Sequence, residues 1–224
     1  MGRPVKTRTQ RRPRGSLTRE QVIEVALQLA DQEGLEALSM AILARRLDCG
    51  VMTVYGDIDN QQDLLDAVAL RALADVRLPR LLPAQPASIL VAWGRALRVV
   101  SLEHPSMPLI FLSQAVIGPG IFQGIEALVG ALAPAGLAAP TGLRAVYAVL
   151  IYASGFVAWE LPHTRRHPEE AYAAAWRREF ASLQPEEFPI TRSLLAELPR
   201  VATTDQFEYG LNALVTGLTA TSAV

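Results

Sequence analysis

The sequence predicts an all-α protein, in which a three-helix helix-turn-helix domain precedes a larger helical bundle. Three observations predict this class. Apolar residues recur at helical spacing along most of the chain, and no alternating strand pattern of useful length is present. Half of the 224 residues are apolar, which is sufficient for a folded core. Segments rich in proline and glycine separate the periodic stretches.

We expect the chain to divide into a basic arm at 1–16, a helix-turn-helix domain at 17–62 and a helical domain at 63–224 that is the candidate for effector binding and dimerisation. The cations of the arm are Arg3, Lys6, Arg8, Arg11, Arg12 and Arg14. Apart from these six residues and Arg19, the chain has 14 basic residues and 22 acidic ones. A basic arm on an acidic body is typical of a nucleic-acid-binding tail, and the alternative is a flexible solubilising tail. The arm is expected to be disordered without a partner.

Side-chain caps mark where the helices of residues 17–62 begin. The expected caps are Thr18 with Gln21 in a capping box, Ser39, and Asn60 with Asp63. Gly34 fits the position that ends the first helix. A third short helix is expected from Val51 to about Gly56, after a break at 48–50. The second and third helices are then about four residues apart, the helix-turn-helix spacing in which the later helix enters the major groove of DNA.

Several side chains of this motif are candidates for contacting DNA. Thr53 can hydrogen bond a phosphate or a base edge, and Tyr55 can donate its hydroxyl to a phosphate. Val51 and Met52 can contact thymine methyl groups, although Met52 has the alternative of packing against the first helix. The candidates on the folded domain are Ser39, Arg45, Val51, Met52, Thr53 and Tyr55.

The charge of the helix-turn-helix domain is unfavourable for DNA binding. Between Ser16 and Leu65 there are three basic residues and nine acidic ones. Phosphate neutralisation supplies most nonspecific affinity, so we expect the arginines of the arm to do much of the binding, on phosphates or in a narrow minor groove. The DNA-binding unit is therefore taken as residues 1–60.

The second domain is expected to be a helical bundle that also forms a homodimer. Its expected helices are 86–103, 106–116, 119–134, 140–161, 168–182 and 204–221, and Pro162 is expected to end the fourth of them. We expect dimerisation through 140–161, which has small residues, and 204–221, whose apolar stripe includes Phe207 and Leu211. The alternative is that the last helix closes its own bundle.

A ligand site in this domain would be an apolar cavity with a few polar groups. The candidate lining residues are Trp93, His104, Phe111, Gln114, Phe122, Tyr152, Phe156 and Trp159. The alternative for each aromatic is an ordinary place in the core.

Other classes of protein and site find little support in the sequence. No arrangement of activated nucleophile, glycine-rich phosphate loop or metal ligands is present, so we expect neither an enzyme nor a cofactor. His163 and His167 have a metal-ligand spacing, but Pro162 and Pro168 favour a loop there and argue against a metal site. Cys49 is expected to pack in a turn, with a redox role as the alternative. Without a secretory signal or a membrane span, a cytoplasmic protein is expected.

The stretch Leu17–Val68 resembles the TetR family of bacterial repressors. The matching residues are Thr18, Ile23, Ala26, Leu29, Gly34, Leu38, Ser39, Ala44, Leu47, Val54, Tyr55, Asn60, Leu64 and Leu65. Residues from about Pro86 to Pro162 look, more loosely, like the C-terminal domain of the tetracycline repressor. The chain departs from the family pattern at Gln61, where a phosphate-binding lysine is usual, and at Asp57.

The resemblance implies a homodimer that binds a palindromic double-stranded operator and is released from it by a small hydrophobic ligand. The ligand would act by moving the fourth helix and the recognition helices. A magnesium–tetracycline ligand is not expected, because Phe111 falls where the tetracycline repressor has its metal-binding histidine. The alternative function is a helix-turn-helix regulator whose C-terminal domain binds a protein partner or no effector.

Overall fold

The computed structural model describes residues 17–56, 58–79, 83–165, 169–194, 197 and 202–220, with backbone alone at 163–165 and 169–173. All of its regular elements are helical. In chain order they are α1 (Arg19–Glu33), the 3-10 turn η1 (Leu35–Ala37), α2 (Met40–Arg46), α3 (Val51–Val54), α4 (Gln61–Leu73), α5 (Pro86–Glu103), α6 (Ser106–Ser113), α7 (Pro119–Leu132), α8 (Ala139–Arg165), α9 (Glu169–Ala181), α10 (Pro189–Ser193) and α11 (Thr204–Ala220).

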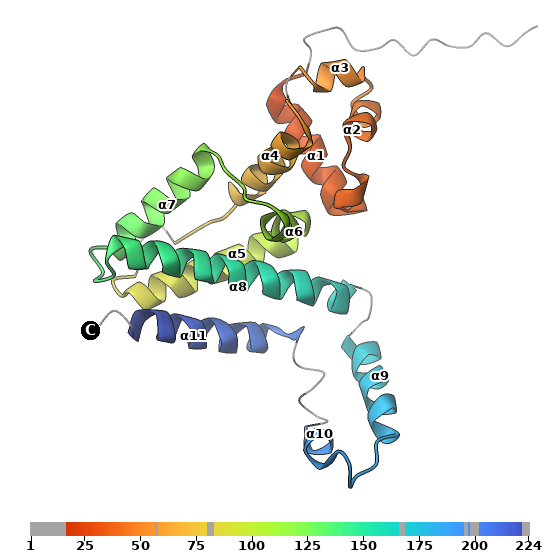
Figure 1. Cartoon of the computed structure of the whole chain (residues 1–224), viewed down its shortest axis with the longest axis vertical. Helices are drawn as coiled ribbons and strands as arrows, with labels where there is room; N and C mark the ends of the chain where they lie inside the picture. The colour runs from red at the N-terminus through yellow and green to blue at the C-terminus, as the bar shows by residue number, and fades with distance from the viewer. Residues whose placement is uncertain are drawn as a thin grey trace, which may run out of the picture.

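Helices α1 to α4 form the N-terminal unit, at the top of Figure 1. The predicted caps are confirmed: Thr18 and Gln21 form a capping box, the Ser39 side chain accepts from the backbone N–H of Ile42, and Asn60 accepts from that of Asp63. Each cap satisfies a backbone donor that the helix leaves unpaired, which fixes the start of the helix. The core of this unit extends to Val100, Met107 and Ile110, so α5 and α6 complete it.

The second core lies among α5, α7, α8 and α11. Figure 1 shows α8 running across the molecule with α11 below it and α5 behind it. Trp93 of α5 donates its indole N–H to the carbonyl of Val146 on α8, at 3.3 Å. Ala139–Pro162 is apolar and long enough to cross a membrane, but it packs against α5, α6, α7 and α11, which accounts for its composition. It is the central helix of the bundle.

Two expectations about the helices are wrong, and two short elements are not predicted by the sequence. Helix α8 continues through Pro162 to Arg165 instead of ending before the proline. The buried Val157, Glu160 and Leu161 hold this end against the rest of the molecule, and Glu160 pairs with Arg98 of α5. This tertiary packing offsets the hydrogen bond that proline removes. The backbone at His163 is therefore helical and not a loop, while the sequence does not predict α10 and η1.

The stripe on α11 is covered within its own bundle. Phe207, Leu211 and Val215 are buried in the second core. Tyr152 of α8 donates its hydroxyl to the carbonyl of Phe207, at 2.9 Å. For this stripe the alternative is confirmed, since α5 and α8 bury it and the last helix closes its own bundle.

Candidate DNA-binding surface and ligand cavity

The short helix α3 presents an apolar surface to solvent. Met52 is 80% exposed, and Val51 and Tyr55 are partly exposed, while Val54 is completely buried in the first core. Val54 thus anchors α3, and the three exposed side chains project from the unit. The high exposure of Met52 argues against the alternative that it packs on α1.

The cations of the N-terminal unit are mostly engaged by its own acids. Arg19 pairs with Asp63 on α4 at 2.8 Å, and Arg46 pairs with Glu33 on α1. Arg45, next to Arg46 on α2, is exposed and has no ion pair among the described residues. It is thus the arginine that this unit leaves available for a phosphate.

Gln61 has a structural role at the position where the family pattern has lysine. Its side-chain amide donates to the carbonyl of Leu38 at 2.7 Å and so ties the start of α4 to the residue before the Ser39 cap. The six cations of the basic arm and Asp57 lie outside the described residues.

A cavity of about 340 Å³ opens in the second domain between α7, α8 and the segment that follows α6. Its walls are mostly apolar. The lining residues are Leu73, Trp93, Phe111, Leu112, Gln114, Ala115, Val116, Ile117, Ile121, Gly124, Ile125, Leu128, Val146, Tyr147, Leu150, Ile151 and Ser154. Leu73 is the last residue of α4, so the cavity touches the helix that belongs to the N-terminal unit.

Of the eight residues predicted for the pocket, Trp93, Phe111 and Gln114 line this cavity. The others lie elsewhere. Phe122 is 62% exposed on α7. Tyr152 and Phe156 face α11, where their rings contact Phe207. They are turned away because a helix places only about every third or fourth residue on one face.

Trp159 also lies outside the cavity. Its ring meets Phe156 edge to face, and 42% of the residue is exposed. In the sequence, ring size and helical spacing do not show which aromatics line the cavity. For those on α8, this is decided only by the packing of the helix between α7 and α11.

Sequence reasoning missed Ser154, which is the most informative polar residue of the cavity. Ser154 is 1% exposed and lines the cavity, and its hydroxyl has no hydrogen-bond partner among the described residues. Leaving a buried hydroxyl unpaired costs on the order of 1–3 kcal/mol, which a ligand bearing a polar group removes. Serine within an apolar helix carries no sequence signal of such a role.

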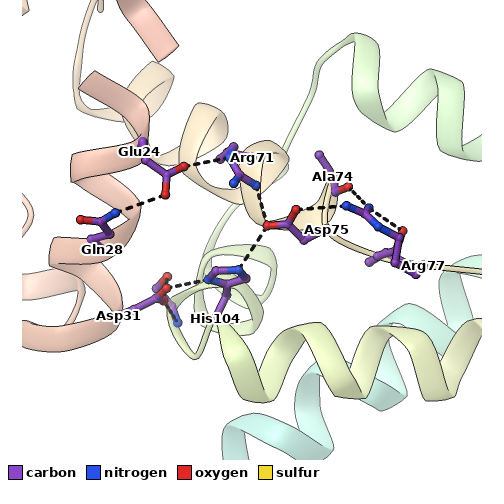
Figure 2. Close-up of polar contacts among 10 residues, drawn as sticks. Glu24, Gln28, Asp31, Arg71, Ala74, Asp75, Arg77 and His104 are labelled. Atoms are coloured by element: carbon purple, nitrogen blue, oxygen red, sulfur yellow. Dashed lines mark hydrogen bonds and ion pairs between the residues drawn. The ribbon is translucent and has the colours of Figure 1, made fainter. Parts of the chain in front are cut away.

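The remaining predicted pocket residue, His104, belongs to a polar cluster between the two units, shown in Figure 2. Its Nδ1 lies 2.7 Å from Oδ2 of Asp31 on α1, and its Nε2 lies 3.4 Å from Oδ2 of Asp75. Arg71 of α4 bridges Asp75 and Glu24, and its hydrogen bond lowers the pKa of Asp75 below the ordinary value. The cluster joins α1, α4 and α5, and its imidazole is therefore a structural contact and not a cavity wall.

The described part of the chain holds no group of three potential metal ligands. The side chains of His163 and His167 lie outside the described residues.

Comparison with known proteins agrees with this architecture. A family model described as "Tetracyclin repressor-like, C-terminal domain" matches residues 82–222. The HTH-type transcriptional repressor DrrR1 of Streptomyces coeruleorubidus is 29% identical, over 94% of this chain and 80% of its own. An HTH-type transcriptional regulator of Saccharopolyspora erythraea is also 29% identical, over 96% of this chain and 90% of its own.

Solved structures show the same fold. Apo ActR of Streptomyces coelicolor matches with a TM-score of 0.78 and 26% identity, covering 94% of this chain and all of its own. ActR in complex with actinorhodin matches equally well, over 93% of this chain. Because the family model spans more than half of the chain, the protein belongs to the TetR family of transcriptional regulators.

Proposed function

We propose that this protein is a repressor that binds operator DNA as a homodimer and is released from it by a small apolar ligand. The observation that carries the proposal is the apolar cavity, which combines the unpaired hydroxyl of Ser154 with a wall formed by Leu73 at the end of α4. A ligand there touches α4, which packs against α1 in the N-terminal unit.

The chemistry of the cavity indicates the kind of ligand. Its volume and apolar walls suit a small, largely apolar molecule, and Ser154 and Gln114 suit one or two polar atoms on it. ActR has been solved with actinorhodin and with (S)-DNPA, which supports a small organic ligand for this related chain.

For the dimer we propose the outer faces of α8 and α11. Leu143, Tyr147, Ile151 and Trp159 follow one another along α8 at multiples of four residues and are all partly exposed, and Tyr147 and Ile151 also line the cavity. Gly155 interrupts this stripe with open space around it, which permits close approach of a second helix. An exposed apolar stripe on a helix is typical of a partner interface, and two helices from each subunit give a four-helix contact under twofold symmetry.

On DNA, we propose that α3 enters the major groove with Val51, Met52, Thr53 and Tyr55, while Arg45 and the basic arm bind phosphates. The ligand shifts the equilibrium only by the difference between its affinities for the DNA-competent and DNA-incompetent forms. We propose that the protein acts in the cytoplasm, where its operator is, and that its function involves no catalytic step and no cofactor.

The test has two stages. Sequences bound by the full-length protein are selected from a random DNA pool, and we expect a palindrome with two half-sites. The resulting complex is then challenged with actinorhodin and a library of polycyclic compounds, with thermal shift to detect binding to the free protein. The absence of any preferred sequence would refute the DNA-binding part of the proposal. Compounds that bind without releasing the operator would refute the regulatory part.

A further inference from the structure

The exposed face of α3 has a composition that limits how it can read DNA. Met52 is 80% exposed and Val51 is 39% exposed, and Figure 1 shows α3 at the end of the molecule opposite α8 and α11. No side chain of α3 carries a charge or an amide. Arginine, lysine, asparagine, glutamine and the carboxylates are the side chains that identify bases by hydrogen bonds in the major groove. The hydroxyl of Thr53 is therefore the one side-chain group of α3 that can hydrogen bond a base edge.

The polar side chains at the end of α2 and the start of α4, on either side of α3 in the chain, are engaged within the protein. Gln61 donates its amide to the carbonyl of Leu38 at 2.7 Å, and Arg46 pairs with Glu33. Each would have to give up an internal bond in order to read a base. Arg45 is exposed on α2, which is the helix that crosses the DNA backbone in this motif, so its position suits a phosphate. Base recognition by the folded domain is thus left largely to the side chains of α3.

The first two residues of α3 are the ones expected to lie nearest the bases. In a helix-turn-helix, the N-terminal residues of the recognition helix contact base edges. In this chain these residues are Val51 and Met52, directly after Gly50 at the N-cap. Val54 is completely buried and fixes α3 on the first core, while Met52 projects from it. The side chains nearest the bases are therefore apolar.

We infer that Val51 and Met52 read the operator through the C5 methyl groups of thymine. The inference rests on the proposed function and specifies the bases that α3 recognises. Thymine presents a methyl group in the major groove, and burying that methyl against an apolar side chain is favourable. A G·C pair presents an amino group and acceptors there, which an apolar side chain covers without supplying a hydrogen-bond partner. Each half-site should therefore have A·T or T·A pairs where it faces Val51 and Met52.

The first experiment removes single methyl groups from the DNA. An operator is selected from a random pool with the full-length protein, and each thymine is then replaced by deoxyuridine at the equivalent position of both half-sites. Uracil forms the same base pair and lacks only the methyl group. At the positions that face α3, we expect affinity to fall about fourfold for each methyl removed, and thus about fifteenfold for the symmetric pair. Tolerance of uracil at every position would overturn the inference.

The second experiment identifies the side chain that contacts each methyl. Met52→Ala should weaken binding to the thymine operator, and at a sensitive position thymine and uracil should then be bound equally. Val51→Ala is tested in the same way. Tyr55→Phe is the matched control, because it removes a hydroxyl proposed to bind a phosphate and should weaken binding to both operators by the same factor. Melting temperature checks that each variant is folded. A thymine preference that persists at every position in both alanine variants would exclude these two side chains as its source.

The third experiment separates the methyl readout from DNA binding itself. Cytosine in place of a sensitive thymine should weaken binding, and 5-methylcytosine at that position should recover about fourfold, because it restores the methyl group within a C·G pair. Equal binding of cytosine and 5-methylcytosine operators would refute the methyl readout and leave the proposed function intact. If the selection yields no preferred sequence, the proposed function itself is refuted.

Discussion

Arg45 and Arg46 are neighbours on α2 with different surroundings. Arg46 pairs with Glu33, whereas Arg45 is exposed without an ion pair among the described residues. We predict that Arg45→Ala weakens operator binding and reduces the slope of log affinity against log salt by about 0.9, the value for a single neutralised phosphate. Arg46→Ala is the matched control and should change the slope less. Equal slopes for wild type and Arg45→Ala, measured by fluorescence anisotropy from low to moderate salt, would contradict a phosphate contact.

Glu208 supplies a pH-dependent contribution to stability. Arg95 donates two hydrogen bonds to its carboxylate, both at 2.8 Å, and these lower the pKa of Glu208 below its ordinary value of 4.5. A lowered pKa in the folded state means that the contribution is present above pH 4.5 and disappears as the pH falls through the folded-state value. Glu208→Gln should therefore lower the free energy of unfolding by up to about 1 kcal/mol at pH 7, since the pair is partly exposed.

The check is denaturant unfolding of both proteins at neutral and strongly acidic pH. The difference between wild type and Glu208→Gln should disappear in acid. A difference that persists unchanged would show that the variant acts by packing rather than by charge.

Among single residues, those whose role depends on local sequence could be predicted. Thr18, Ser39 and Asn60 cap their helices as expected, because a cap involves only the next three residues. Ser154 could not be found, because its unpaired hydroxyl results from contacts among helices distant in sequence. Gln61 shows the same limit, since its departure from the family pattern is explained only by its bond to Leu38.

At the scale of elements, α11 has two faces with different expected roles. Phe207 is 1% exposed and packs on Tyr152 and Phe156, whereas Tyr209 is 73% exposed. We predict that Phe207→Ala lowers the free energy of unfolding by about 3–5 kcal/mol, since it leaves a cavity in the second core. Tyr209→Ala should change the stability of the subunit little but weaken the dimer. Sedimentation measures dimer formation and denaturant unfolding measures the stability of the subunit, so the two methods separate the effects. A Phe207→Ala variant as stable as the wild type would contradict the packing described.

The helices themselves are largely predictable, and the exceptions have physical reasons. The bounds of α5 agree with the expected 86–103, because Pro86 starts the helix and its apolar spacing is regular. The prediction at Pro162 is wrong, since propensity favours a break there while the buried Glu160 and Leu161 hold the helix in place. Tertiary packing overrides local preference at such a position.

Across the whole chain, net positive charge is concentrated in residues 1–16, while the rest of the sequence has more acidic than basic residues. The arm carries six cations before Leu17, whereas the N-terminal unit engages Arg19 and Arg46 in ion pairs. We predict that deleting residues 2–15 weakens operator binding and flattens the salt dependence by about 0.9 for each phosphate that the arm neutralises in the intact protein. The shortened protein should keep its melting temperature. An unchanged salt slope would refute a role of the arm on DNA.

The cavity is also a property of the whole molecule, which limits what the sequence reveals about it. Trp93, Phe111 and Gln114 line one cavity, while the five other candidates lie outside it. Tyr152, Phe156 and Trp159 do so because the sequence does not determine the orientation of α8. Leu73 has no sequence signal of a ligand site, since it lies at the end of a helix that belongs to the N-terminal unit. The connection between the two units therefore emerges only in the three-dimensional structure.

The ligand of the cavity and the operator DNA are expected to bind preferentially to two different states of the protein. The most direct measurement is the operator dissociation constant of the full-length protein with and without a saturating compound that binds the cavity. We expect this dissociation constant to rise about tenfold or more, and the dissociation constant of the compound to rise by the same factor when operator is bound, because coupling between two sites is reciprocal. If a compound binds the cavity and operator affinity stays the same, the cavity does not regulate DNA binding.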